Sequence, residues 1–278
     1  MQKDHLPTRR RMLLAGAAAL GAASTAGAIV AGGAEDGAGT AAAPAPGPQA
    51  RQAPRPSAFR LQPLTGDGPP RAAPRGLKVR NEPILQISGR GRRMMLTFDD
   101  GPNPQFTPHI LDTLAKYGVR AMFFLCGECV VDNRELVARM ADEGHVVGNH
   151  TWTHPLLTTL DRKQIRSEMK RTSDVIEDAY GERPQWFRAP YGAWNRAAFQ
   201  LGAEMGMEPM GWTVDTTDWM EPGTAAIVDR VESGAAPGVV VLSHDAGGDR
   251  SQTVHAIREW LPHLLDSGYH MTVPLRRV

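Results

Sequence analysis

From residue 94 onward, short apolar runs alternate with longer segments in which apolar residues recur every three or four positions. The short runs predict buried strands and the longer segments predict amphipathic helices. The predicted strands cover 94–98, 121–125, 146–149, 186–188, 209–214, 239–242 and 269–273. The predicted helices cover 106–114, 136–140, 165–176, 227–231 and 257–265, and a glycine just past such segments is typical of a left-handed C-terminal cap.

This alternation predicts an α/β fold with a parallel sheet, either closed as a barrel or open and wound on both faces. The 278 residues are enough for one such domain. Charged or titratable residues follow the ends of most of the predicted strands: Asp99, Asp100, His150, Arg188, Asp215 and His244. Because parallel α/β folds assemble their sites where strands end, these side chains are expected at one rim.

The segment before the predicted strands divides into two parts. Residues 1–31 place Arg9–Arg11 before an apolar stretch and Ala26–Ala28, which predicts a cleaved signal peptide similar to twin-arginine export signals. An ordinary secretory signal is the alternative, and either one predicts a secreted or wall-associated protein without a stable membrane anchor. Residues 32–77 are rich in Ala, Pro and Arg, which predicts a disordered linker before a catalytic domain at 78–278.

Charge is unevenly distributed along the chain. Residues 94–278 contain 17 Lys or Arg and 25 Asp or Glu, whereas residues 32–93 carry a net charge of +6. An acidic domain argues against nucleic acid as a partner. The basic linker suggests weak attraction to anionic cell-wall polymers, although a solvated linker explains the same composition.

Two histidines and two aspartates suggest metal chemistry. His150 and His154 are four positions apart, and Pro155 favours a loop or single turn there. Each feature alone has an ordinary explanation, since Asp-Asp-Gly-Pro at 99–102 also suits a turn. Together, a carboxylate and two imidazoles form a hydrolytic zinc-type ligand set.

Five motifs in order give the chain a specific resemblance. They are Thr97–Pro102 (TFDDGP), His150–His154 (HTWTH), Arg188–Gly192 (RAPYG), Asp215–Trp219 (DTTDW) and Leu242–His244 (LSH). This set resembles the polysaccharide deacetylases, carbohydrate esterase family four, over roughly 85–278. The resemblance implies a distorted (β/α)₇ barrel, which selects the closed alternative. It also implies hydrolysis of a carbon–nitrogen amide bond in an acetylated polysaccharide.

The resemblance implies metal ligands at three positions: Asp100, His150 and His154. Asp99 would be the general base, with Arg188 paired to it. The backbone N–H of Tyr191 would stabilise the oxyanion. Zn²⁺ is the expected cofactor, and Co²⁺ or Ni²⁺ would suit the same ligands. Because adjacent strand residues point to opposite faces, Asp99 and Asp100 can share a site only if the chain turns sharply.

By the same resemblance, His244 would be the general acid. Asp215 would orient and charge His244, with Asp218 as the second choice. Trp219 and Leu242 would line the pocket for the acetyl methyl group. Each residue also has a structural explanation: a turn cap for the aspartates, and the ordinary core for Trp219 and Leu242.

Cys126-Gly127-Glu128-Cys129 departs from the expected family pattern. A local disulfide, a redox pair and half of a zinc site are the three interpretations. Export favours the disulfide, and the lack of a second cysteine pair argues against zinc.

N-deacetylation of N-acetylglucosamine in peptidoglycan or chitin-type chains is the leading expectation for function. O-deacetylation of acetylated xylan would use the same residues. A catalytically inactive carbohydrate-binding protein is the alternative from another class, and the complete set of candidate catalytic residues argues against it.

Overall fold

The computed structural model describes residues 76–87 and 91–274. The predicted signal peptide at 1–31 and nearly all of the predicted linker at 32–77 lie outside these ranges. The described strands are β1 (Arg93–Asp99), β2 (Met122–Leu125), β3 (Val146–Asn149), β4 (Trp186–Phe187), β5 (Glu208–Pro209), β6 (Val214–Asp215), β7 (Val240–His244) and β8 (His270–Met271).

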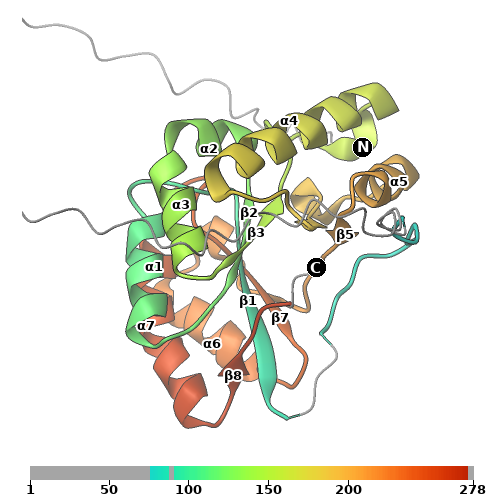
Figure 1. Cartoon of the computed structure of the whole chain (residues 1–278). Coiled ribbons are helices and arrows are strands. Elements are labelled where there is room, and N and C mark those ends of the chain that lie inside the picture. Colours follow the sequence, from blue (N-terminus) through green and yellow to red (C-terminus); the bar gives the residue numbers. More distant parts are fainter. Residues whose placement is uncertain (1–75, 88–90, 275–278) are drawn as a thin grey trace, which may run out of the picture. The chain divides into compact units, whose positions relative to one another are not determined.

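Helices follow most of these strands (Figure 1). They are α1 (Thr107–Lys116), α2 (Gly127–Asp132), α3 (Arg134–Asp142), α4 (Arg162–Tyr180), α5 (Arg196–Glu204), α6 (Thr224–Gly234) and α7 (Ser251–Asp266). Short 3₁₀ turns cover Leu157–Thr159, Pro190–Gly192 and Asp218–Met220. Helices α2 and α5 are additions to the helices predicted from periodicity. No helix in the described ranges combines the length and apolarity needed to cross a membrane.

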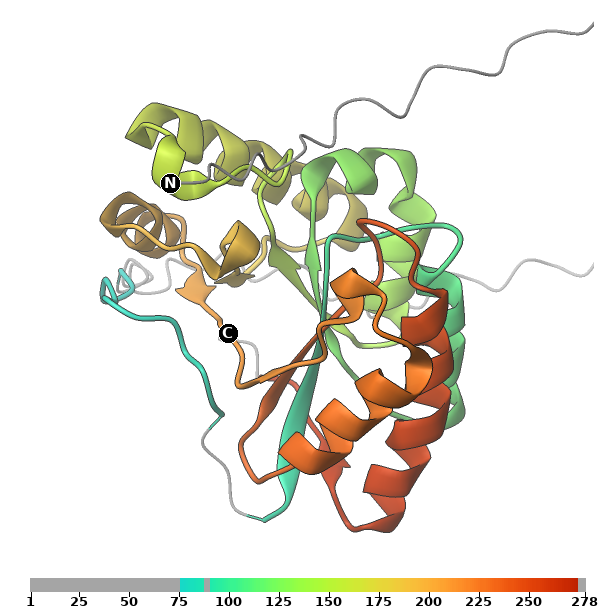
Figure 2. The same ribbon diagram turned by 180° about the vertical axis from the view of Figure 1, so that it is seen from behind.

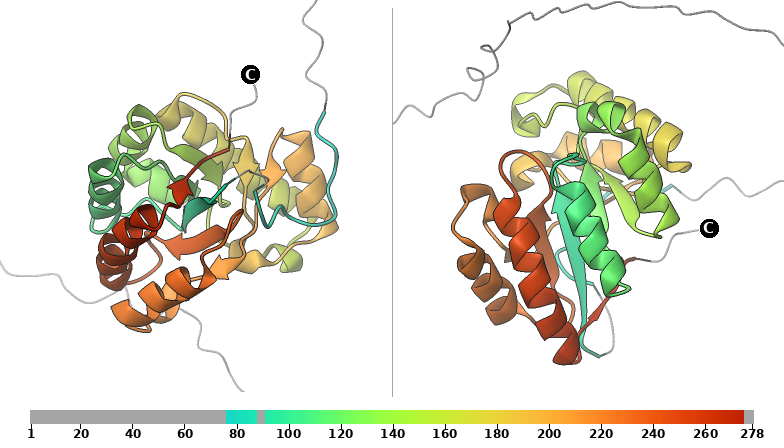
Figure 3. Two further views of the ribbon diagram at one scale, coloured as in Figure 1. Left: turned by 90° about the horizontal axis from the view of Figure 1, so that it is seen from below. Right: turned by 90° about the vertical axis from the view of Figure 1, so that its left-hand side faces the viewer.

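The strands form one parallel sheet in the order β5-β4-β3-β2-β1-β7-β6, and β8 pairs with the start of β1. Helices surround this sheet when it is viewed from below (Figure 3). The two terminal strands of the order, β5 and β6, are not paired with each other. The sheet is therefore the distorted (β/α)₇ barrel that the resemblance implied.

A segment before β1 spans the two ends of this order. Ile84 forms a parallel bridge with Met210, just after β5, and Gln86 forms an antiparallel bridge with Val239, just before β7. The backbone N–H of Ile84 donates to Pro209 O at 2.9 Å, and Ile87 N–H donates to Gly238 O at 2.9 Å. In Figure 2 this segment runs on the side of the sheet away from α1 and α7. It satisfies backbone groups that an open edge would expose.

The predicted strand 209–214 is wrong as a single element. The structure divides it into β5 and β6, which lie at opposite ends of the strand order. Gly211 lies between them, and a Cβ there would approach the Leu85 Cδ2 atom to 2.7 Å. The apolar residues of this run serve two clusters, because Met210 and Trp212 pack in one and Val214 packs against the main core, so the run does not mark one strand.

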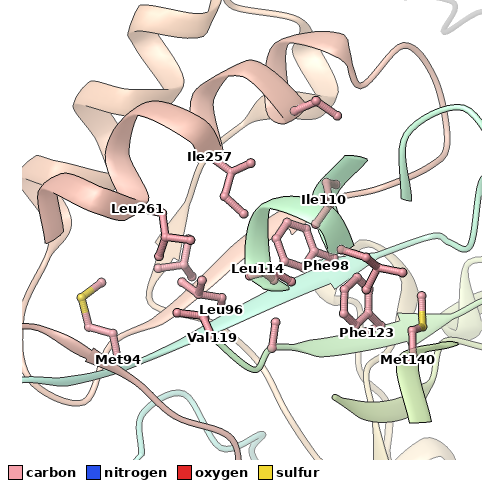
Figure 4. Packing of buried hydrophobic residues seen from close by; sticks show 14 of the residues in the cluster. Met94, Leu96, Phe98, Ile110, Leu114, Val119, Phe123, Met140, Ile257 and Leu261 are labelled. Atoms are coloured by element: carbon pink, nitrogen blue, oxygen red, sulfur yellow. The ribbon is translucent and has the colours of Figure 1, made fainter. Parts of the chain in front are cut away.

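The main core lies between β1, β2 and the helices α1 and α7 (Figure 4). Leu96 and Phe98 project from β1 toward Ile110 and Leu114 of α1, and all four are at most 1% exposed. The Phe98 ring stacks on Phe123 with centroids 5.2 Å apart. Burying each such side chain contributes about 1.5–3 kcal/mol, which fixes the strand that ends in Asp99.

Candidate active site

Asp99, the last residue of β1, is held by a buried arginine. Its Oδ1 accepts a hydrogen bond from Arg188 Nη1 at 2.7 Å, and Arg188 is 0% exposed. The guanidinium also donates to Thr97 Oγ1 at 2.8 Å, to Met210 O at 3.2 Å and to Gly211 O at 2.9 Å. Burial lowers the pKa of Arg188, and the charges of Asp99 and Asp215 oppose that shift. This pairing orients Asp99 and compensates its buried charge.

The chain turns immediately after Asp99, as the shared site requires. Asp100 has a φ of 74°, in the left-handed region that residues with a side chain rarely adopt. The turn brings the second carboxylate back to the rim, so that His150 Nε2 lies 3.6 Å from Asp99 Oδ2 and 3.5 Å from Asp100 Oδ1. The requirement for a sharp turn is therefore met by this backbone conformation.

Asp100, His150 and His154 converge on one point. The ligand atoms of the three side chains lie within 4.8 Å of one another. His154 Nε2 is 3.3 Å from Asp100 Oδ1, and that oxygen is buried without a hydrogen-bond partner. Ligands about 2.0–2.1 Å from a tetrahedral Zn²⁺ would be roughly 3.3 Å apart. The unpartnered oxygen and the spacing both fit a divalent cation.

The surroundings of the two imidazoles also suit them as metal ligands. His150 Nδ1 donates to the carbonyl oxygen of Arg188 at 2.8 Å, and this bond orients the ring so that Nε2 faces Asp99 and Asp100. Burial and the neighbouring His150 lower the pKa of His154 to about 4. Burial alone would raise the pKa of Asp100, but the two histidines hold it below its ordinary value. The site therefore presents the Asp100 carboxylate beside a His154 imidazole whose lowered pKa keeps it neutral at neutral pH.

His244 is the last residue of β7, the strand that pairs with β1. In the β1–β7 pairing, Asp99 and His244 are register partners. His244 Nδ1 lies 2.7 Å from Asp218 Oδ1, while Asp218 Oδ2 accepts from His244 N–H at 2.8 Å and from Thr253 Oγ1 at 2.7 Å. Burial alone would lower the pKa of His244, but the bond to Asp218 and nearby carboxylates raise it to about 9. His244 is therefore a protonated imidazolium at neutral pH in this environment.

The prediction of Asp215 as the partner of His244 is wrong, and the second choice, Asp218, occupies that position. Asp215 ends β6 and its Oδ1 accepts the Thr217 N–H at 2.7 Å, so its side chain closes a turn. Thr217 has a φ of 50°, and this left-handed residue directs the following Asp218 inward. Asp218 is 1% exposed, which fits a carboxylate dedicated to one imidazole.

The remaining predicted residues lie around these groups. Tyr191 has a φ of 61°, and its ring contacts the His154 ring edge to face with centroids 4.5 Å apart. Trp219 directly follows Asp218 and is 46% exposed. Leu242 is buried on β7, in register with Asp215. The oxyanion role of Tyr191 and the pocket roles of Trp219 and Leu242 stay predictions.

Sequence reasoning missed Asp245, which follows His244. Its side chain is fully buried, and its Oδ2 accepts from Thr107 Oγ1 at 2.5 Å while its Oδ1 has no partner. Its backbone N–H donates to Asp99 O at 3.2 Å, and a Cβ at Gly101 would meet both of its carboxyl oxygens at 2.3 Å. Burial raises the pKa of Asp245 to about 7. A lone Asp after a strand gives no sequence signal for this support beneath the Asp99–Gly101 turn.

The expected disulfide is not formed: Cys126 and Cys129 are both free thiols in the described part of the chain. The Cys126 Sγ faces the His150 carbonyl oxygen at 3.8 Å, while Cys129 belongs to the first turn of α2. Burial raises the pKa of Cys129 to about 11 and that of Cys126 well above its ordinary value. Both groups are therefore thiols rather than reactive thiolates at neutral pH.

Comparisons with known proteins agree with this geometry. The family model described as polysaccharide deacetylase matches residues 86–210. A chitooligosaccharide deacetylase of Rhizobium leguminosarum bv. trifolii is 40% identical over 200 residues, covering 68% of this chain and 93% of that protein.

Solved structures match as well. The peptidoglycan deacetylase PdaC of Bacillus subtilis matches with a TM-score of 0.62 and 40% identity, covering 67% of this chain and 90% of that one. The Bacillus anthracis protein BA3943, described as a CE4 family pseudoenzyme, matches with a TM-score of 0.65 and 31% identity, covering 70% and 67%.

Proposed function

The chain belongs to the polysaccharide deacetylase family, and we propose that it removes the N-acetyl group from N-acetylglucosamine units in a metal-dependent hydrolysis. One observation carries the proposal: Asp99 and His244 are register partners on neighbouring strands, beside the Asp100–His150–His154 cluster. A base, an acid and a metal-type ligand set are thus within reach of one acetyl group.

Hydrolysis needs a water nucleophile and a stabilised oxyanion. A divalent cation held by Asp100, His150 and His154 would polarise the acetyl carbonyl and lower the pKa of a bound water. Asp99 accepts a proton from the attacking water through Oδ2, because Oδ1 is engaged by Arg188. The backbone N–H of Tyr191 donates to the developing oxyanion.

Release of the sugar amine needs a proton donor. His244 donates from Nε2 to the leaving nitrogen, because Nδ1 is bonded to Asp218. The raised pKa of His244, about 9, keeps this proton available at neutral pH. Trp219 and Leu242 enclose the acetyl methyl group. Zn²⁺ is the proposed metal, and Co²⁺ or Ni²⁺ would suit the same ligand set.

Relatives support a glucosamine-type substrate. Two of them are named for chitooligosaccharide and for peptidoglycan. The test is acetate release by the purified protein lacking residues 1–31 from N-acetylated chitooligosaccharide, peptidoglycan fragments and acetylxylan, with Zn²⁺ or with chelator. We expect metal-dependent acetate from an N-acetylated glycan. Acetate from acetylxylan alone would change the assignment to an O-deacetylase, the alternative that the same residues serve.

A binding-only role is the contrasting outcome. The similarity to a CE4 pseudoenzyme makes this control necessary. Glycan binding without acetate release from any of the three substrates, in protein shown to contain metal, would contradict the proposed activity. The presence of two intact ion pairs, Asp99 with Arg188 and His244 with Asp218, favours turnover.

We also propose that the protein acts outside the cytoplasm after export by residues 1–31, with weak linker binding to anionic wall polymers. The paired arginines and the basic composition of 32–77 support this. Fusing residues 1–31 to a reporter that is active only after folded export tests the route. Lysine substitution of Arg9, Arg10 and Arg11 should abolish that export if the twin-arginine assignment is correct.

A further inference from the structure

The loop that carries both histidine ligands has no regular secondary structure of its own. Between His150 and Pro155 the backbone contains two residues with side chains in the left-handed region, Thr151 with φ of 70° and His154 with φ of 55°. Such conformations cost on the order of 1–3 kcal/mol each and persist only where surrounding contacts enforce them. Contacts from outside the loop must therefore stabilise this conformation.

Helix α4 supplies one set of contacts through a single carboxylate. Glu168 Oε2 accepts the backbone N–H groups of Trp152 and Thr153, both at 2.8 Å. Glu168 Oε1 accepts the Thr153 hydroxyl at 3.2 Å. Hydrogen bonds to a charged acceptor are stronger than those between neutral groups. Three donors from two consecutive loop residues thus converge on one side chain.

The opposite side of the loop is held by the start of α2. Gly127 N–H donates to Thr151 O at 3.0 Å, and Glu128 N–H donates to Trp152 O at 3.3 Å. A Cβ at Gly127 would approach the Trp152 Cε3 atom to 2.3 Å, so the indole packs directly on the bare backbone. Arg171 of α4 covers the Trp152 ring at 4.0 Å from its centroid. The loop is fixed from both sides.

The first half of the loop has separate supports. Asn149 Oδ1 accepts the Thr151 N–H at 2.9 Å, while Asn149 Nδ2 donates to Met169 O at 2.7 Å. His150 is oriented by the Arg188 carbonyl at 2.8 Å. Glu168 therefore acts on the second half, which leads into His154.

We propose that Glu168 is a positioning residue that holds the 152–154 backbone so that His154 Nε2 faces Asp100 Oδ1. The inference rests on the proposed metal-dependent function, because it assigns His154 as a ligand. Glu168 itself does not touch the substrate or the reacting atoms. Its effect is to lower the entropy cost of closing the ligand set.

The test compares Glu168→Ala with Glu168→Gln in otherwise intact protein. Outer-shell changes weaken metal affinity by roughly 10–100-fold, and we expect Glu168→Ala to lower Zn²⁺ affinity by this factor in a chelator competition assay. Glu168→Gln keeps a carbonyl oxygen for the two N–H groups and should stay within about threefold of the parent. Saturating Zn²⁺ should restore most of the kcat of Glu168→Ala, a recovery that general destabilisation would not produce.

A second measurement needs neither substrate nor metal. In metal-free protein, the Trp152 and Thr153 amides should exchange hydrogen at least about tenfold faster in Glu168→Ala, while the Gly127 amide keeps its protection. Asp174→Ala is the matched control, since Asp174 lies on the same helix and the change removes exposed ion pairs to Lys170 and to Arg183, which follows the helix. Asp174→Ala should change neither the Zn²⁺ affinity nor the amide exchange of Trp152 and Thr153.

Different results would contradict the positioning role of Glu168 and the proposed deacetylase function. Unchanged exchange at 152 and 153 in Glu168→Ala, or equal Zn²⁺ affinity in all three variants, would overturn the positioning role. Absence of acetate release by the parent protein would overturn the proposed function instead. If the parent bound no metal, the amide exchange would still decide whether Glu168 holds the loop.

Discussion

The residues proposed to hold the metal (Asp100, His150 and His154, the metal side) and those proposed to supply the acid (His244 and Asp218, the acid side) come from different structural elements. On the metal side, Asp100 and His150 directly follow the last residues of β1 and β3, the two strands that flank β2. On the acid side, His244 ends β7, but its partner Asp218 comes from a 3₁₀ turn flanked by Thr217 and Glu221 with φ of 50° and 53°. The ends of two strands therefore place Asp100 and His150, and the following loop places His154. The conformation of one turn places Asp218.

Because of this difference, a substitution should be able to remove the acid without removing the metal. The metal cluster contains no contribution from the 215–221 turn, and the His244–Asp218 pair contains none from the 150–154 loop. The predictions below use this independence, starting with the largest expected effect.

Replacing a ligand should remove both metal and turnover. His150→Ala deletes one of three ligands, so Zn²⁺ content should fall to background and kcat/KM should drop by about 10⁴-fold, since metal-assisted polarisation is worth several kcal/mol. Metal analysis and acetate release measure the two effects. Retained stoichiometric zinc in this variant would place the metal elsewhere.

Replacing the acid should remove turnover and leave the metal. His244→Ala should retain zinc but lower kcat by about 10²–10⁴-fold, the usual contribution of a general acid. A zinc content that fell in parallel with kcat would break the distinction between the two sides.

The two aspartates of the acid side provide a matched pair. Asp218→Asn should lower kcat by about 10²-fold, because a neutral amide cannot stabilise the imidazolium. Asp215→Asn should have a clearly smaller effect, because Asp215 bonds to Thr217 N–H rather than to His244. Steady-state kinetics of both variants decide the assignment, and the reverse order would restore Asp215 as the partner.

The His244–Asp218 pair sets an alkaline limit on activity. Since the bond to Asp218 and the nearby carboxylates raise the pKa of His244 to about 9, the acid form and activity should decline as pH rises through this value. The stabilisation from this raised pKa is fully present below the ordinary value of 6.5 and is lost as pH rises through about 9. In Asp218→Asn the alkaline limb of the kcat profile should move to lower pH. An unmoved limb would assign it to another group.

The smallest effect concerns Asp245, which packs against the Asp99–Gly101 turn. Burial raises its pKa from 3.8 to about 7, so the native state binds this proton more tightly than the unfolded state. The unfolding free energy should therefore fall as pH rises from about 4 to 7, and Asp245→Asn should flatten this decline. Urea unfolding of metal-free protein across this range measures it. An unchanged slope would show that Asp245 does not titrate there.

Sequence reasoning succeeded where the signal is local. Motif spacing identified Asp100, His150 and His154, which the structure brings together, and the strand–helix alternation with the family resemblance predicted the barrel. It failed for Asp215 and Asp218, because Asp215 ends β6 and Asp218 follows three residues later in the same motif. The left-handed conformation of Thr217, which the motif does not reveal, directs Asp218 inward.

Other misses have the same cause. The apolar run 209–214 conceals a crossing between opposite ends of the sheet, since burial alone does not specify a strand partner. Glu168 and Asp245 themselves lie outside the motifs, and each acts through hydrogen bonds to residues distant in the sequence. Such support depends on tertiary packing, which periodicity and spacing do not encode.

The segment around Ile84 and Gln86 has a consequence for the order of folding. It pairs with Met210 and Val239, and β1 pairs with β7, so the N-terminal part of the sheet waits for residues far along the chain. Closing such long loops is entropically costly and slows assembly. A nascent chain cannot join Asp99 to His244 until residue 244 has left the ribosome. The proposed base and acid are therefore brought together late, and a chain that ends before residue 244 lacks one of them.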